Sequence, residues 1–202
     1  MRPESPVDRM RLNHSRRNPG ARLLVAALLL LSLPAPALAA PQKHSEYDVK
    51  AAYLFNFGKF VRMSKPAAVR SSFDICTLGH DFMGPSLKSL ADNTKINGLP
   101  VHIAHLDDIS AAKNCAIVFM SATEGSHIRE DLAILDNADI LTVSDAPDFL
   151  QHGGMIQFVS ISNHVRFGVN LDSVNRTHLV LSSELLRVAA SVIGKPSFGA
   201  SQ

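Results

Sequence analysis

The chain has 202 residues, with 20 Lys or Arg, 18 Asp or Glu and a formal net charge of +2. This length suits one domain with a hydrophobic core of ordinary size. Segment 1–39 holds six Arg and two acidic residues, so the rest keeps 14 basic and 16 acidic residues, a net charge of −2. A weakly acidic remainder argues against a nucleic-acid partner.

Segment 1–39 has the layout of a secretory signal peptide. A basic region comes first, formed by Arg11, Arg16, Arg17 and Arg22. An apolar run over 23–33 follows, and the small residues of PAPALAA offer a cleavage site. The run is shorter than the roughly 20 apolar residues that span a membrane. We therefore expect export, starting from Met1 or Met10, and no membrane span after cleavage.

Two cysteines, Cys76 and Cys115, stand in the predicted mature chain. Both belong to segments with the pattern of buried strands, and an oxidising compartment outside the cytoplasm favours disulfides. We predict that they are bonded, which stabilises the fold by about 4 kcal/mol in the chain-entropy model. The alternative is two buried free thiols.

The predicted elements begin with a helix from Ser45, capped with the help of Asp48, to about Arg62, before Pro66. Strands and helices then alternate. The predicted strands are FDICTLG (73–79), LPVHIAHL (99–106), CAIVFMS (115–121) and ILTVSD (140–145). The predicted helical segments are 82–91, a short one from Asp107 or Asp108, 126–136 and 146–151.

The end of the chain differs from this alternation. Two apolar halves of GMIQFVSISNHVRFGVNL flank Ser162-Asn163, which predicts a hairpin. A last helix is predicted over 183–193. The whole pattern predicts one α/β domain over 45–194 and a tail over 195–202. Its sheet is expected to be mostly parallel, with helices on both faces and the antiparallel hairpin at one edge.

The first predicted helix contains VKAAYLFNFGKFV (49–61), which is apolar nearly all round. Such a helix is either buried on two sides or meets another molecule. Spacings of three and four place Tyr53, Phe57 and Phe60 on one stripe that we expect to pack inward. Phe55 lies off that stripe and is therefore a candidate for contact with a partner.

Catalytic motifs are missing from the sequence. LGHDFMG (78–84) follows a strand but lacks the Lys-Ser/Thr of a phosphate loop. The histidines and cysteines have no zinc spacing, and no G-x-S-x-G elbow occurs. Asp145 stands at a strand end, where catalytic acids often lie, but a turn role is the simpler interpretation. We expect no catalytic residues, no cofactor and no metal.

The ordered set VKAAYLFNFGKFV, Cys76, Asn97-Gly98, Cys115, ILTVSD, GGMIQF, VRFGVNLD and LSSELLRVA resembles the YfiR family of periplasmic proteins. The resemblance covers about 47–193. It implies a regulator that holds the periplasmic sensing domain of an inner-membrane diguanylate cyclase inactive, and so controls cyclic di-GMP and biofilm formation. It also implies the disulfide. Relatives often have an acidic residue where this chain has Gly168.

From the helix and the hairpin we predict a partner-binding surface that includes Phe55, Lys59, Met155, Arg166 and Phe167. A homodimer is also possible. Two other functions remain open at this point, namely a periplasmic receptor for a small ligand and an envelope hydrolase. A neighbouring gene for a membrane protein with a cytoplasmic cyclase or kinase domain would favour inhibition over the receptor. A pocket with convergent polar groups and perturbed acids would favour the hydrolase.

Overall fold

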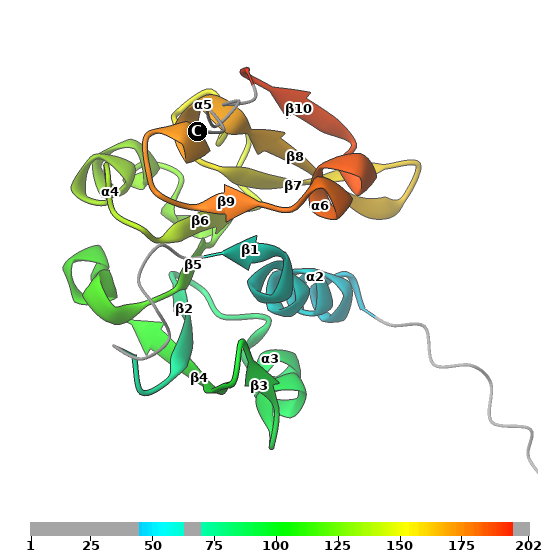
Figure 1. Ribbon diagram of the computed structural model, residues 1–202. Coiled ribbons are helices and arrows are strands. Elements are labelled where there is room, and N and C mark those ends of the chain that lie inside the picture. Colours follow the sequence, from blue (N-terminus) through cyan, green and yellow to red (C-terminus); the bar gives the residue numbers. More distant parts are fainter. Residues whose placement is uncertain (1–44, 63–69, 196–202) are drawn as a thin grey trace, which may run out of the picture. The chain divides into compact units, whose positions relative to one another are not determined.

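Figure 1 shows the computed structural model, which describes residues 45–62 and 70–195 within one compact unit. The predicted signal peptide and nearly all of the predicted tail lie outside these residues. The helices are α2 (Glu46–Phe60), α3 (Gly84–Ala91), α4 (Ile128–Ile134), α5 (Leu171–Asn175), α6 (Ser183–Val188) and the 3-10 turns η3 (Ile109–Asn114) and η4 (Ala122–Glu124). The strands are β1 (Val61–Arg62), β2 (Phe73–Leu78), β3 (Lys95–Ile96), β4 (Leu99–Leu106), β5 (Ile117–Met120), β6 (Leu141–Ser144), β7 (Ile156–Ile161), β8 (His164–Asn170), β9 (Val180–Leu181) and β10 (Ser191–Ile193).

The larger sheet of the described part has the strand order β10-β8-β7-β6-β5-β2-β4-β3. Neighbours from β4 through β7 run parallel, whereas β7 and β8 form an antiparallel hairpin. Ser162 and Asn163 both have positive φ (50° and 61°) in its turn, as a tight hairpin requires. The predicted α/β fold class is therefore confirmed.

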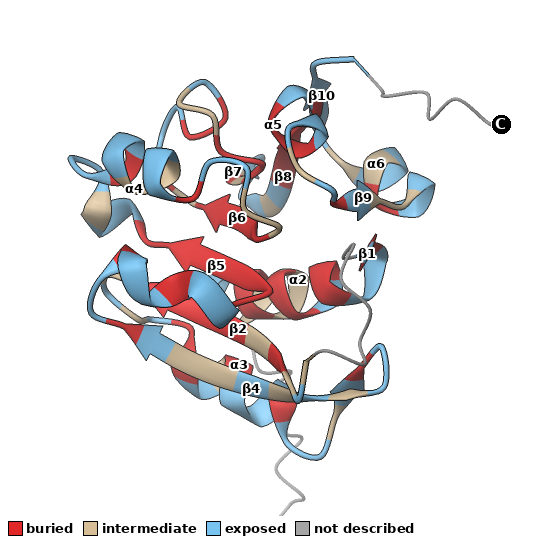
Figure 2. Cartoon of the chain, turned by 60° about the vertical axis from the view of Figure 1, so that its left-hand side comes forward, coloured by how far each residue is buried: buried red, intermediate tan, exposed pale blue. Residues whose placement is uncertain are grey.

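Two apolar layers cover the two faces of this sheet, because successive side chains of a strand point to opposite faces. In β5, Ile117 and Phe119 join the layer of α2 and α3, whereas Val118 and Met120 join the layer of η3 and α4. Figure 2 shows β5 and β6 buried along their length. Burial on both faces explains why these strands are apolar without alternation.

The last predicted helix is wrong in its second half. Helix α6 ends at Val188, and Ser191–Ile193 form β10, which pairs in parallel with β8. The hairpin therefore lies one strand inside the edge of the sheet. Gly168 stands opposite Ser191, and a Cβ atom at position 168 would come within 2.6 Å of the Ser191 hydroxyl. In this chain β10 thus occupies the space that the side chain of an acidic residue at 168 would need.

Two further differences come from short elements. Helix α5 follows directly on β8, where the sequence shows no helical pattern. Helix α2 ends at Phe60, two residues earlier than predicted, because Val61 and Arg62 pair with Leu181 and Val180 in a small second sheet. Two residues per strand are too few to carry a periodic signal.

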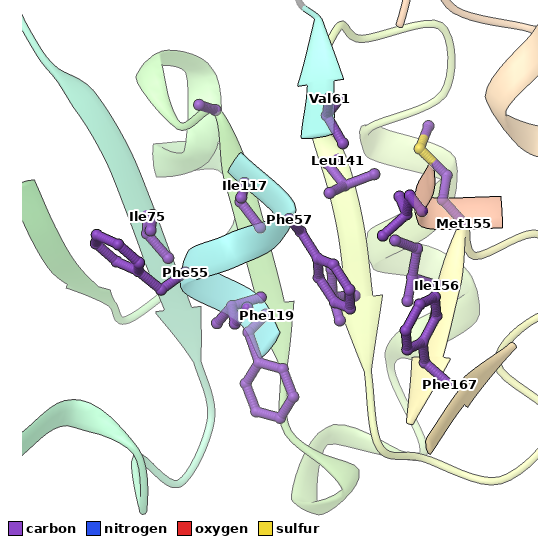
Figure 3. Packing of buried hydrophobic residues seen from close by; sticks show 14 of the residues in the cluster. Phe55, Phe57, Val61, Ile75, Ile117, Phe119, Leu141, Met155, Ile156 and Phe167 are labelled. Carbon is purple, nitrogen blue, oxygen red and sulfur yellow. The ribbon is translucent and has the colours of Figure 1, made fainter. Parts of the chain in front are cut away.

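Helix α2 begins as predicted, with a reciprocal capping box. The Ser45 hydroxyl accepts a hydrogen bond from the Asp48 backbone, and the Asp48 carboxylate accepts one from the Ser45 backbone. The helix lies close to the sheet at Gly58, where a Cβ atom would come within 2.9 Å of the Phe73 ring. Figure 3 shows Phe55 reaching from α2 toward the side of Ile75 and Phe57 toward the side of Phe167.

Candidate partner-binding surface

Three of the five residues predicted to bind a partner are buried. The exposed fractions are 4% for Phe55, 5% for Met155 and 1% for Phe167. All three belong to the apolar layer on the α2 side of the sheet. The premise that these side chains face solvent is wrong, since none has the surface that a contact needs in this structure.

The error for Phe55 arose from choosing the wrong stripe of α2 as the packed one. The buried residues of the helix share one broad face, which packs on the sheet and against α3, and Phe55 belongs to that face. They are Lys50, Ala51, Leu54, Phe55, Phe57 and Gly58. Phe57, on the predicted stripe, is buried as expected, with its ring centroid 5.0 Å from that of Phe167. Phe60, expected to pack inward, is instead 40% exposed at the end of the helix.

Lys59 and Arg166 are both exposed, the first in the last turn of α2 and the second in β8. The Lys59 ammonium lies 5.1 Å from the centroid of the Phe55 ring. The Arg166 guanidinium donates a hydrogen bond to the Val188 carbonyl over 3.3 Å, which ties β8 to the end of α6.

Exposed apolar side chains adjoin these cations. The Phe60 carbonyl accepts a hydrogen bond from Ser182, just before α6, and Arg62 stands directly opposite Val180 across the β1–β9 pair. Val180 is 48% exposed and Val188 51% exposed. We call this surface the basic face, defined by Lys59, Phe60, Arg62, Arg166, Val180 and Val188.

The basic face combines apolar area with uncompensated positive charge. Within the part of the chain that the structure describes, Lys59, Arg62 and Arg166 form no ion pair. Such a surface suits a partner with an apolar contact and carboxylates around it. Sequence reasoning found Lys59 and Arg166 but missed Phe60, Arg62, Val180 and Val188. Their positions follow from long-range contacts, namely the β1–β9 pairing, the Phe60–Ser182 hydrogen bond and the Arg166–Val188 hydrogen bond.

Asp145, the strand-end acid, is engaged in structural contacts. One of its carboxylate oxygens lies 2.8 Å from the Lys50 ammonium, and the other accepts a hydrogen bond from the Ala122 backbone. Lys50 is 6% exposed and also lies 2.7 Å from Glu46. Burial by itself lowers the pKa of Lys50, but its hydrogen bonds and charge interactions with Asp145 and Glu46 outweigh burial and raise the pKa above 10.5.

We expect Lys50→Met to lower the free energy of unfolding by about 1–3 kcal/mol, because the largely buried Asp145 carboxylate loses its cation.

The difference in stability between the wild type and Lys50→Met should depend on pH, with a definite sign. A raised pKa means that the folded state holds this proton more tightly than the unfolded chain does. Protonated Lys50 therefore stabilises the folded state fully below the unfolded pKa near 10.5. This stabilisation is lost as pH rises through the folded pKa. Urea unfolding of both proteins between pH 7 and 11 measures this, and a constant difference would contradict it.

Aromatic side chains are also exposed at the other end of α2. The Tyr47 and Phe82 rings stack with centroids 4.7 Å apart, and His80 lies 4.1 Å from Phe82. This stack lies at the start of the helix and was not predicted.

Within residues 45–62 and 70–195, no three His, Cys, Asp or Glu side chains are grouped to hold a metal ion. No described helix has the length and apolar character that crossing a membrane requires.

A family model described as YfiR/HmsC-like matches residues 47–190. The chain belongs to the YfiR/HmsC-like family. This membership supports a periplasmic regulator of cyclic di-GMP signalling in general. Among curated proteins, none matches the chain.

Two solved structures are similar to this chain. A conserved domain protein from Vibrio cholerae O1 biovar El Tor has a TM-score of 0.51 at 10% identity, over 73% of this chain and 60% of that one. The ABC domain from Streptococcus pneumoniae in complex with L-Trp has a TM-score of 0.45 at 11% identity, over 74% and 62%. The match thus spans less than two thirds of either solved chain, and the first supports the fold alone.

Proposed function

We propose that this YfiR/HmsC-like protein binds and inhibits the periplasmic domain of an inner-membrane signalling enzyme, a diguanylate cyclase. Segment 1–39 would direct its export. The observation that carries the proposal is the basic face, an exposed apolar and cationic surface on a chain whose family regulates cyclic di-GMP signalling. Inhibition of this kind needs a contact surface and no catalytic group.

Phe60 takes the role of apolar anchor that the sequence had suggested for Phe55. Interfaces concentrate binding energy in a few large side chains near their centre, surrounded by polar groups. Phe60 is the one aromatic member of the basic face, and Lys59 and Arg62 are its near neighbours in sequence. A partner that fits this arrangement offers an apolar pocket with carboxylates around it.

A pull-down with the tagged protein from solubilised inner membrane tests the proposed function. We expect it to retain a membrane protein whose cytoplasmic part is a diguanylate cyclase, and deletion of the gene to raise cellular cyclic di-GMP. Retention of no such protein, together with unchanged cyclic di-GMP after deletion, would overturn the proposal.

The double variant Lys59→Glu/Arg166→Glu tests the surface. Reversing two exposed cations should weaken binding to the captured cyclase domain by at least about tenfold, mainly through slower association. Lys88→Glu is the matched control, because Lys88 is an exposed cation on α3. In Figure 1, α3 lies on the opposite side of α2 from β9 and α6. Binding is measured by biolayer interferometry at two salt concentrations. Equal loss in the double variant and in the control would show that the basic face is not the contact.

A further inference from the structure

A groove of about 410 Å³ lies between η3 and the end of α4. The segment that leads into β6 completes its lining. Its apolar lining includes Ile109, Leu135 and Ile140, which are buried at 2%, 8% and 5% exposure. Ile134 at its margin is 60% exposed, the largest exposed fraction of any large apolar side chain in the described residues. The volume is within the range of small-molecule sites.

The same groove is lined by three basic side chains, Arg70, Lys113 and His178, and by one carboxylate, Asp139. Asp139 accepts a hydrogen bond from the His178 backbone and lies 3.2 Å from its ring. Neither Arg70 nor Lys113 has an ion pair within the described ranges. The Arg70 guanidinium donates to the Asn114 carbonyl over 3.4 Å, which holds the side chain at this place.

We infer that this groove binds a small organic anion with an apolar body. The apolar body would cover Ile134 and rest on Ile109, Leu135 and Ile140, which removes apolar surface from water. The anionic end, a carboxylate or a comparable group, would lie toward Arg70 and Lys113. The inference does not depend on the proposed function, because it concerns a different surface and is tested on the purified protein.

The groove and the disulfide share one apolar layer. Ile109, Leu135 and Ile140 belong to the same buried cluster as Cys76 and Cys115. A ligand seated there adds contacts to the layer that the disulfide links. Because a ligand that binds only the folded state stabilises it by mass action, the melting temperature should rise with ligand concentration.

Octanoate is the test probe, with 1-octanol and acetate as matched controls that lack the charge or the apolar body. Amide shifts in ¹H–¹⁵N spectra of the purified protein should locate octanoate at residues of η3 and the end of α4. Octanoate should bind more tightly than either control. Lys113→Gln should weaken octanoate about fivefold, as expected for one exposed ion pair, and leave 1-octanol unchanged. Lys95→Gln, an exposed cation outside the groove, should change neither.

Three results would overturn the inference. Octanoate and 1-octanol could bind equally tightly, which would mean that Arg70 and Lys113 do not contribute to binding of the carboxylate. Octanoate could shift amides elsewhere, or shift none at millimolar concentration. Lys113→Gln, which replaces an exposed side chain and should fold normally, could bind octanoate as the wild type does.

Discussion

Replacing both Cys76 and Cys115 by Ala is expected to lower the free energy of unfolding by about 4 kcal/mol. The bond closes a loop with a sequence separation of 39, and in the chain-entropy model its loss frees that loop in the unfolded chain. The Cα atoms are 6.0 Å apart, within the usual range for a disulfide. Both cysteines are buried, at 2% and 3% exposure, between β2 and the start of β5.

Guanidinium unfolding of the oxidised wild type and the double variant measures this difference. Reduced wild type serves as the control, and it should unfold close to the double variant. Thiol labelling of denatured, non-reduced protein should find no free thiol. Two reactive thiols, or unfolding midpoints that coincide for the oxidised and reduced proteins, would show that the bond does not stabilise the fold.

Phe57→Ala is expected to cost about 3–5 kcal/mol, the usual loss for a fully buried ring. Its ring centroid lies 5.0 Å from that of Phe167 and 5.9 Å from that of Phe158, so alanine leaves a cavity between α2 and the hairpin. Phe55→Ala should cost a similar amount, because this ring is also buried. The sequence had instead placed Phe55 off the packed stripe, as a candidate for contact with a partner.

Phe60→Ala is the matched control in the same helix, since it makes the same substitution at a side chain that is 40% exposed. Its cost should stay within about 1 kcal/mol, while binding to the captured cyclase domain should weaken about thirtyfold if Phe60 is the anchor of the interface. Thermal melts and binding curves of Phe55→Ala, Phe57→Ala and Phe60→Ala measure the loss of stability and the loss of binding separately. A Phe60→Ala variant that melts as low as Phe57→Ala would place Phe60 in the core instead.

The elements that sequence reasoning found are those with strong local signals. Ser45 and Asp48 cap α2 because their side chains bond to backbone within three residues, which is a local event. Asp108 begins η3 in the same way. The turn at Ser162-Asn163 was predicted because a two-residue hairpin loop needs residues that tolerate positive φ. Long apolar runs such as the one in β5 follow from burial on both faces of the sheet.

The elements that it missed depend on pairing between distant segments. Strands β1, β9 and β10 are two or three residues long and carry no periodic pattern. Residues 191–193 become a strand because β8 offers them an open edge, which outweighs a weak helical propensity. The exposure of Phe60 follows from the same long-range pairing, since β1 begins at the next residue.

The α/β class, the disulfide pair and the burial of Phe57 could be predicted from the sequence, because each rests on composition, compartment or apolar pattern. Which side chains of the apolar helix α2 face solvent depends on the packing of distant segments around it. Phe55 and Phe60 are the same residue type five positions apart, and they differ only in what packs beside them. Burial depends on all neighbours in space, and a helix with apolar residues on every side does not show from its sequence which of its faces packs.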